Sequence, residues 1–366
     1  METDGKQQQE SQAIDIEAVL VESKELIDST IESWLPRTFD KATLEKLCGP
    51  ARYAYDAESA TKAVAVPMWD ILDRGGKRWR PVLLLLIAEA LGAHVDKVKD
   101  FVVLCEVVHN GTLVIDDIED RSEVRRGGKC IHLIYGVNVA VNAGNAMYYL
   151  PLTILRSLRG KVPNETLLEA YELYGQELTN LHFGQGLDIW WHNGGKMPSV
   201  DEYLQMCAYK TGTLARLSAK LSALFAGGTP EQVTALGLFS ETIGVAFQIQ
   251  DDILNLIGVK LAKTKGQYGE DIHEGKRTLM VLHCLSVAST EEAKRLEDIL
   301  NQHPEDQAVI NEAIAIIEKN GSIEYARQKA KELVTVAWER VEQVLPPSLA
   351  KEKLAAFARF LVDRDI

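Results

Sequence analysis

The sequence has no apolar run long enough to cross a membrane. Its apolar stretch from Pro81 to Ala88 ends at Glu89, whereas a membrane-spanning helix needs about 20 apolar residues. An integral membrane protein is therefore excluded. The beginning of the chain, METDGKQQQESQ, also lacks the apolar or Arg-rich character of a signal or transit peptide. We expect residues 1–14 to form a flexible polar tail in front of one domain over residues 15–366.

Cysteine is scarce and irregularly spaced. The chain has five cysteines, an odd number without Cys-x-x-Cys spacing, which argues against both a disulfide framework and a zinc site. They are Cys48, Cys105, Cys130, Cys207 and Cys284. A reducing compartment is indicated, and the cytoplasm is the expected location.

The sequence also lacks an excess of basic residues. It carries 40 Lys and Arg against 53 Asp and Glu, which gives a formal net charge of −13. The summed field of such a chain repels nucleic acid and anionic lipid unless cations gather locally. We therefore expect no nucleic-acid partner, and a phosphate-bearing ligand would need a local cluster of lysine and arginine.

Alternating strand patterns, hairpin turns and Pro- or Ser-rich linkers are absent too. Apolar residues recur instead at helical spacing, and Gly-rich breakers separate the periodic segments. These segments are Ile16–Trp34, Val66–Leu72, Val98–Ile118, Thr166–Trp190, Val200–Ala226, Glu231–Leu256 and Ile323–Val344. We predict an all-α fold, a single large helical bundle of ten or more helices.

Two acidic clusters of the same pattern each end an apolar helix. They read DDIED at residues 116–120 and DDILN at residues 251–255. The first and fifth positions share a helix face, where like charges destabilise a helix by roughly a few tenths of a kcal/mol per pair. One such cluster is as well explained by a solvated helix end, but two matching clusters favour a binding function. Oxygen ligands without histidine or cysteine suit Mg²⁺, which binds through one or two carboxylates plus substrate phosphates.

Further polar residues share a helix face with each acidic cluster. His109 lies two turns before Asp116, and Gln248 precedes Asp252 by four residues. A lone histidine on an apolar helix is more often an ordinary core residue. Only the neighbouring acidic cluster makes His109 a candidate for ligand binding.

Basic residues gather in two runs, RGGKRWRP at residues 74–81 and RSEVRR at residues 121–126. Guanidinium forks and ammonium groups in such loops suit phosphate recognition. Either run by itself would be a solvated basic turn. KTG at residues 210–212, Lys265 and Lys276 extend the pattern.

These motifs together form an ordered set. Along the chain they are GGKRxRP from Gly75, His109, DDxxD from Asp116, RRG from Arg125, GQGxD from Gly184, KTG from Lys210, FQxQDD from Phe247 and EGK from Glu274. The set resembles the trans-isoprenyl diphosphate synthases. It is most similar to the eukaryotic geranylgeranyl diphosphate synthases, because of LHxGQGLDI from Leu181 and the second cluster ending in Asn255. With the helical pattern around the motifs, the resemblance covers essentially the whole chain.

The resemblance implies an isoprenoid synthase-like bundle around a central active-site cavity, with residues 15–366 as the polyprenyl synthase catalytic domain. It implies that isopentenyl diphosphate binds Lys77, Arg80, His109 and Arg126. The allylic diphosphate is expected to bind Arg125, Lys210, Thr211, Gln248, Lys265 and Lys276. Three Mg²⁺ ions are expected to link that diphosphate to Asp116, Asp120 and Asp251, with Asp117 and Asp252 in support. These five aspartates and Lys210 are the expected catalytic residues.

The implied reaction begins when the allylic C–O bond breaks to give a delocalised cation and diphosphate. The double bond of isopentenyl diphosphate attacks the cation, and loss of a proton restores an allylic diphosphate five carbons longer. Mg²⁺ and cationic side chains stabilise the leaving charge. The reaction needs no protein nucleophile, and the released diphosphate is the expected proton acceptor. The stretch 258–275 is a candidate lid that would keep water from the cation.

Product length depends on the depth of the cavity. One helical turn rises about 5.4 Å, close to one extended isoprene unit, and the residues four and five positions before Asp116 are Thr112 and Gly111. Neither is bulky, whereas the resemblance places aromatic plugs there in farnesyl-length enzymes. It also implies a floor made by Tyr148, Tyr149 and His182, although these aromatics could equally be ordinary core. We expect a twenty-carbon product, with farnesyl diphosphate preferred over geranyl and dimethylallyl diphosphate.

Other functions compete with this one. A prenyl synthase of another product length, either C15 or C25 and longer, is the first alternative. A class I terpene cyclase is disfavoured because its second metal motif usually combines Asn or Asp with Ser or Thr and Glu. A noncatalytic regulatory subunit would typically have lost one cluster. The resemblance also implies at least a homodimer, with the lipid product allowing association with a membrane surface.

Overall fold

The structure is a computed structural model that describes residues 14–258 and 268–362. Helices make up nearly all of its regular structure, and the predicted all-α fold is confirmed. Residues 1–13 of the expected tail and residues 259–267 of the candidate lid lie outside the described residues. No helix in the described ranges is long and apolar enough to span a bilayer.

The first part of the chain forms the helices that end at the first acidic cluster and those that pack around it. They are α1 (Ile16–Trp34), α2 (Lys41–Cys48), α3 (Ala57–Ala60), α4 (Val66–Asp73), α5 (Trp79–Ala90), α6 (Val102–Glu119), α7 (Ile131–Tyr135), α8 (Val137–Tyr149), α9 (Leu152–Ser157) and α10 (Asn164–His192). Tighter or wider turns lie between some of them, namely η1 (Thr61–Ala65), η2 (Val95–Lys97) and η3 (Lys99–Phe101).

The second part continues the bundle past the second acidic cluster. Its helices are α11 (Val200–Cys207), α12 (Thr213–Ala226), α13 (Pro230–Ile257), α15 (Glu270–His273), α16 (Leu279–Val287), α17 (Thr290–Gln302), α18 (Gln307–Lys319), α19 (Ser322–Val344) and α20 (Leu349–Val362). A π-helical turn, η4 (Ala208–Gly212), joins α11 to α12.

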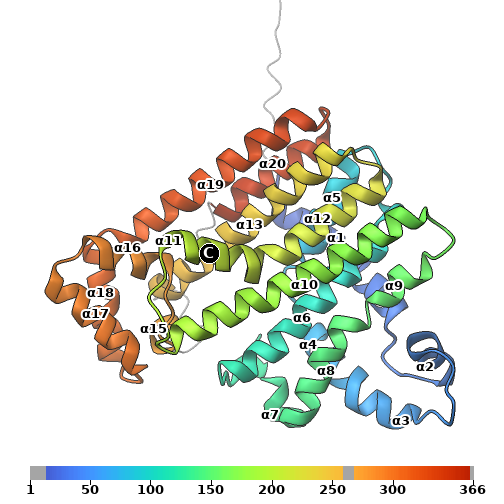
Figure 1. Cartoon of the computed structure of the whole chain (residues 1–366), viewed down its shortest axis with the longest axis horizontal. Helices are drawn as coiled ribbons and strands as arrows, with labels where there is room; N and C mark the ends of the chain where they lie inside the picture. Colours follow the sequence, from blue (N-terminus) through green and yellow to red (C-terminus); the bar gives the residue numbers. More distant parts are fainter. Residues whose placement is uncertain (1–13, 259–267, 363–366) are drawn as a thin grey trace, which may run out of the picture.

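The long helices form the body of the molecule (Figure 1). Helix α13 packs along α12 and α19, and α6 packs along α8. Helix α5 lies between α12 and α20 and is buried along nearly its whole length. Helices α16, α17 and α18 gather at one end of the molecule, and α2 and α3 lie at the other (Figure 1). Both acidic clusters lie at the C-terminal ends of α6 and α13, where Asp117 and Asp252 are buried and Glu119 and Asp251 are exposed.

Most predicted helices are confirmed, and one differs in an informative way. Helix α1 has the predicted bounds, and the side chain of Asp15 caps its first turn by accepting from the Ala18 amide. The predicted helix Val200–Ala226 is instead interrupted by η4, which winds the chain more widely over five residues. A π-turn winds more widely than an α-helix, but η4 spans only five residues, too few for the sequence pattern to reveal it.

The expectation that hairpins are absent is wrong in one place. Strand β1 (Val124–Arg125) pairs antiparallel with β2 (Gly128–Lys129). Arg126 and Gly127 between them have φ angles of 52° and 76°. A type I′ turn, which commonly joins the two strands of a hairpin, requires positive φ at both of its central residues. The strands are too short to give an alternating sequence pattern. The hairpin turns the basic run after the first acidic cluster back toward α4 and α6.

Candidate active site

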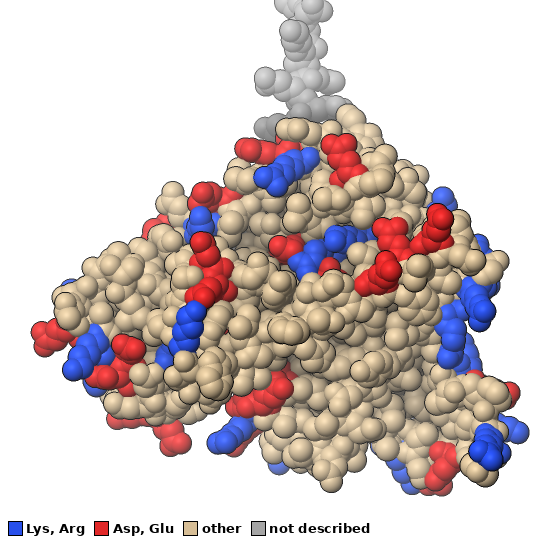
Figure 2. Space-filling view, viewed as in Figure 1, with Lys and Arg blue, Asp and Glu red and all other residues tan. Residues whose placement is uncertain are grey.

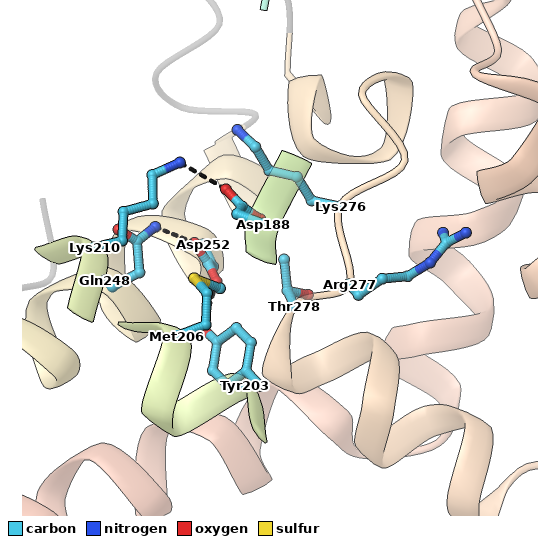
Figure 3. Close-up of a pocket in the computed structure, with 9 residues that line it drawn as sticks. All are labelled: Asp188, Tyr203, Met206, Lys210, Gln248, Asp252, Lys276, Arg277 and Thr278. Atoms are coloured by element: carbon cyan, nitrogen blue, oxygen red, sulfur yellow. Dashed lines mark hydrogen bonds and ion pairs between the residues drawn. The ribbon is translucent and has the colours of Figure 1, made fainter. Parts of the chain in front are cut away.

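The two acidic clusters meet at a pair of lysines. Lys210, Lys276 and Asp252 line one small cavity (Figure 3), and Nζ of Lys210 lies 3.6 Å from Oδ1 of Asp116. Burial lowers the pKa of Lys210, but the charges of Asp188 and Asp116 outweigh it and the net shift is upward. Both acidic helix ends therefore face fixed positive charge.

Asp116 is the ionised centre of the first cluster. Its Oδ1 accepts a hydrogen bond of 2.9 Å from Gln185 of α10, and its Oδ2 lies 3.7 Å from Nη2 of Arg125. Burial by itself would raise its pKa, but Lys210, Lys276 and Arg125 hold the pKa below its ordinary value. A carboxylate kept charged in a partly buried site is suited to bind a metal ion.

The other two aspartates of the first cluster have different environments. Asp117 is fully buried and binds Arg125, whose Nε lies 2.7 Å from Oδ1. It therefore orients a cation and does not face the cavity. Burial, followed by the charge of Asp116, raises the pKa of Asp120 to about 7. A divalent cation held between Asp116 and Asp120 would remove this repulsion.

In the second cluster, Asp252 is buried and held from both sides. Its Oδ2 accepts from the hydroxyl of Tyr203 at 2.7 Å. Its Oδ1 accepts from the amide of Gln248 at 2.8 Å (Figure 3). Burial and the charge of Asp271 raise its pKa to about 8. Asp251 is exposed. The amide oxygen of Asn255 accepts from the Asp271 backbone amide at 3.1 Å, so it anchors the start of α15.

The donor set fits a hard divalent cation that is completed by substrate. Nowhere in the described ranges do three or more His, Cys, Asp or Glu side chains converge as a ready metal site. Mg²⁺ does not need such a cage, because it retains waters and takes part of its shell from phosphate oxygens. Separate carboxylates on α6 and α13, with oxygen ligands alone, match that requirement.

The basic residues expected to bind the second substrate lie at the start of α5 and in the hairpin. Lys77 is exposed in the loop before α5, whereas Arg80 is buried with its guanidinium 4.3 Å from the centre of the Trp79 ring. Burial lowers the pKa of Arg80 to about 10. Burial and the neighbouring charge of Arg80 lower the pKa of His109 well below its ordinary value, so His109 is neutral at physiological pH.

A buried network that was not predicted joins these two basic segments. Arg78 donates to Glu106 at 2.6 Å and to Asp28 at 3.0 Å. Asn110 donates to the same Glu106 oxygen at 2.9 Å and accepts from Nη1 of Arg126 at 2.9 Å. The network runs from α1 through α6 to the hairpin, and it fixes the position of Arg126 relative to the loop that carries Lys77.

The sequence contains one signal for this network, the acidic residue Glu106, but no signal for the conformation of Arg78. Glu106 is the single acidic residue within the apolar part of α6 from Val102 to Ile115, and a buried acid of this kind needs a partner. Arg78 has a φ of 51°, an uncommon conformation for a residue other than glycine. No residue pattern indicates that conformation, which turns Arg78 into the core while Lys77 stays exposed.

The described residues expected to bind the allylic diphosphate lie close to the two acidic clusters. Lys210 donates to Asp188 at 2.6 Å (Figure 3), and Thr211 donates to Oε1 of Gln248 at 2.8 Å. Nζ of Lys276 lies 3.3 Å from Asp271. Lys265 lies outside the described residues. Asp188, which holds Lys210, was not predicted, and its place in the GQGxD motif was the available signal.

The two tyrosines of α8 that are expected to set product length differ in exposure. Tyr148 is 5% exposed, and its ring lies 5.4 Å from that of His182 in an edge-on arrangement. A Cβ on Gly111 would lie 2.8 Å from Cβ of Met147 and 3.2 Å from the Tyr148 ring, so Gly111 allows α6 and α8 to pack closely. Thr112 is partly buried. Tyr149 is 67% exposed, so its part in a floor would require a second chain to cover it.

The fold and the site together define a class: an all-α enzyme in which two carboxylate clusters and two groups of cations serve phosphate-bearing substrates. The model of the polyprenyl synthetase family matches residues 61–317. The chain belongs to the polyprenyl synthetase family, and its activity is that of a trans-prenyltransferase. The resemblance inferred from the motifs is confirmed. The family is in general dependent on divalent metal.

Individual relatives agree with this assignment. The chain is 33% identical to a geranylgeranyl pyrophosphate synthase of Macrophomina phaseolina, over 81% of this chain and 85% of that one. It is 32% identical to a geranylfarnesyl diphosphate synthase of Natronomonas pharaonis, over 95% and 98%. The crystal structure of geranylgeranyl pyrophosphate synthetase from Pyrococcus horikoshii Ot3 superimposes with a TM-score of 0.81 at 30% identity, over 96% of this chain and 98% of that chain.

Proposed function

We propose that this chain condenses isopentenyl diphosphate with an allylic diphosphate, with farnesyl diphosphate preferred, to make geranylgeranyl diphosphate. One observation carries the proposal: Lys210 lies 3.6 Å from Asp116 and lines a cavity together with Lys276 and Asp252. Lys210 thus links Asp116 of the first cluster to a cavity that Lys276 and Asp252 of the second cluster also line, as a site for a metal-bound diphosphate leaving group requires.

The two groups of cations support two separate diphosphate sites. Lys210, Thr211, Gln248 and Lys276 lie between the acidic clusters and are proposed to bind the allylic substrate that ionises. Lys77, Arg80, His109 and Arg126 are proposed to bind isopentenyl diphosphate. The two sites differ in their acidic neighbours, because the main counter-charge of the second is the buried Glu106, which is already paired with Arg78. The first site is therefore the one suited to hold Mg²⁺.

Each side chain has a definable task in this reaction. Asp116, Asp120 and Asp251 are proposed to hold three Mg²⁺ ions, which would supply the charge that neutralises the leaving diphosphate. Lys210 and Lys276 add fixed positive charge at the same place, at no reorganisation cost when the C–O bond breaks. Neutral His109 can donate one hydrogen bond to the second diphosphate, while Arg80 and Arg126 provide its counter-charge. Asp117 and Asp252 orient Arg125 and Gln248.

The decisive experiment is incubation of the purified chain with Mg²⁺, isopentenyl diphosphate and, in turn, dimethylallyl, geranyl and farnesyl diphosphate. Chromatography of the dephosphorylated products is expected to give a twenty-carbon alcohol from each primer, with the highest kcat/KM for farnesyl diphosphate. A fifteen- or twenty-five-carbon end product would assign another chain length. A cyclic hydrocarbon, or no elongation with any primer, would contradict the proposed function.

We also propose a homodimer formed through α8 and α10. Large apolar side chains are exposed at helical spacing on both helices, and the surface over α8 and the middle of α10 is largely uncharged in Figure 2. These side chains are Val137, Val141 and Tyr149 on α8 and Leu168, Tyr171, Phe183 and Trp190 on α10. Contiguous exposed apolar surface of this kind is typical of protein interfaces.

Phe183→Glu is expected to convert the dimer to a monomer. The side chain is 66% exposed in the single chain, so a charge there costs little in the monomer and is desolvated in the dimer. Sedimentation velocity would measure the change in mass. Val21→Glu is the matched control, since Val21 is 73% exposed on α1 and its replacement should leave the dimer intact. A Phe183→Glu dimer as tight as that of the unchanged chain would place the interface elsewhere.

A further inference from the structure

The π-turn η4 holds the side chains proposed to bind the allylic diphosphate. It spans Ala208–Gly212 and carries Lys210 and Thr211 between α11 and α12. A π-turn is rare and is frequently found at functional sites. Since the wider winding gives poorer backbone packing, something outside the turn has to hold it in place. The contacts of η4 with α10 and α13 supply that support.

Helix α10 approaches η4 at a glycine. A Cβ on Gly184 would lie 2.3 Å from the backbone nitrogen of Lys210 and 2.7 Å from the carbonyl carbon of Tyr209. Both are backbone atoms, so no side-chain rotation could relieve the overlap. One turn further along α10, Asp188 accepts the hydrogen bond of 2.6 Å from Lys210. Because Gly184 has no Cβ, the backbone of η4 can come close enough to α10 for Lys210 to pair with Asp188.

Helix α13 repeats this arrangement on the opposite side. A Cβ on Gly244 would lie 2.6 Å from Cα of Gly212 and 3.0 Å from the carbonyl oxygen of Thr211. One turn further along α13, Gln248 accepts from the hydroxyl of Thr211 at 2.8 Å. On each flanking helix, therefore, a glycine packs against the backbone of η4. Four residues later on the same helix, a polar side chain forms a hydrogen bond with Lys210 or Thr211.

A buried ion-pair network links α10 and α13 next to η4. Arg216 of α12 is 8% exposed and donates from Nε to Glu177 of α10 at 2.6 Å. Its Nη1 pairs with Glu241 of α13. Because Arg216 bridges α10 and α13, the two helices cannot spread apart to make room for a larger residue next to η4.

We propose that Gly184 and Gly244 are positioning residues that fix the Lys210 ammonium and the Thr211 hydroxyl against the metal-bound diphosphate. The inference rests on the proposed function in one respect, namely that these two groups face the allylic diphosphate. A methyl group at position 184 would force η4 to retreat by about 1 Å before ordinary van der Waals separation is restored. A displacement of that size at a catalytic group lowers turnover by about 100-fold.

A purely structural role for these glycines gives a different result. General loosening of the bundle would weaken both substrate sites together, because Arg80 and Arg126 depend on the same core. Displacement of η4 alone would lower kcat and weaken Mg²⁺-dependent diphosphate binding while the KM for isopentenyl diphosphate changed less than about two-fold. The ratio of these effects therefore separates positioning from stability.

The test is a series of glycine-to-alanine variants with graded contact distances. Gly186→Ala is the matched control, because it lies in the same motif of α10 and a Cβ there meets no atom of the same chain within 4 Å; sedimentation velocity checks that the variant keeps the proposed dimer, since Gly186 lies between Phe183 and Trp190 on α10. Gly212→Ala follows, with a Cβ 3.0 Å from the carbonyl oxygen of Glu241, and then Gly244→Ala at 2.6 Å and Gly184→Ala at 2.3 Å. We expect kcat to fall in this order, from unchanged to about 100-fold lower.

A second measurement is independent of turnover. Calorimetric titration of each folded variant with Mg²⁺ and inorganic diphosphate is expected to give affinity at least about ten-fold weaker for Gly184→Ala than for Gly186→Ala. Equal kcat and equal affinity in these two variants would overturn the inference, as would a parallel rise in the KM for isopentenyl diphosphate. If Gly184→Ala fails to fold, the milder Gly212→Ala and Gly244→Ala variants decide by the same criteria. If the unchanged chain does not elongate any primer, the proposed function fails, and the titration alone decides the inference.

Discussion

Replacing Asp116 by asparagine is expected to lower kcat by about 10³-fold or more at saturating Mg²⁺. Asparagine has the same size and can still accept the hydrogen bond from Gln185, but it loses the charge that would bind the metal. Lys210 and Arg125 keep their other partners, Asp188 and Asp117, so the fold should persist. Steady-state turnover with both substrates, together with circular dichroism, measures the two effects separately.

The control for this prediction lies one turn along the same helix. Glu119 accepts from the same Gln185 amide at 2.8 Å, but it is exposed. Glu119→Gln removes one negative charge from the same cluster and is expected to change kcat by less than about three-fold, since an exposed charge is well screened. If the Asp116→Asn enzyme kept more than a tenth of the original turnover, Asp116 would not be a metal ligand.

The residues of the candidate site that could be predicted from the sequence are those whose position destabilises the fold unless they bind a ligand. Asp116 and Asp120 repel each other at the end of an apolar helix, and a second cluster of the same pattern begins at Asp251. One cluster alone could be a solvated helix end, but the two together favour a binding role. The bounds of α1 were also predictable, because its apolar period and its capping residue Asp15 act locally.

The parts that escaped prediction depend on contacts between distant segments. Asp252 was assigned a supporting role, but the sequence gives no hint that Tyr203 supplies its second hydrogen bond. The conformation of Arg78 depends on Glu106 and Asp28, which lie in two other helices. The wider winding of η4 covers only five residues, too few to show in the apolar pattern, and only the packing of α10 and α13 reveals why the chain widens there.

The close packing of α6 on α8 limits which residues can tune product length. A Cβ on Gly144 would lie 2.9 Å from the Ile115 side chain, and one on Gly111 would lie 2.9 Å from the Gly144 carbonyl oxygen. A bulky residue at position 111 would therefore push α8 away as a whole before it could plug the cavity. Thr112, one position further along α6, does not share this restriction. Within one chain, the buried part of the proposed floor is thus Tyr148, because His182 is exposed like Tyr149 and a second chain would have to cover it.

Tyr148→Ala is expected to lengthen the product from twenty carbons to twenty-five and beyond. The Tyr148 ring is nearly fully buried, between Gly111 on one side and the His182 ring on the other. Its removal opens space in the direction in which α6 would guide the growing chain, by more than the rise of one helical turn, about 5.4 Å. Chromatography of the products made from farnesyl diphosphate, with isopentenyl diphosphate in excess, measures the shift.

The cost in stability and the control follow from the same contacts. Loss of a buried aromatic ring destabilises a protein by about 3 kcal/mol or more, so the assay temperature should lie well below the melting temperature of the variant. Tyr148→Phe keeps the ring, and the hydrogen bond that Tyr148 accepts from the Tyr174 hydroxyl uses its backbone carbonyl, so this variant should leave the product at twenty carbons. An unchanged product in Tyr148→Ala would move the floor away from α8, because a ring that limits chain growth cannot be removed without effect.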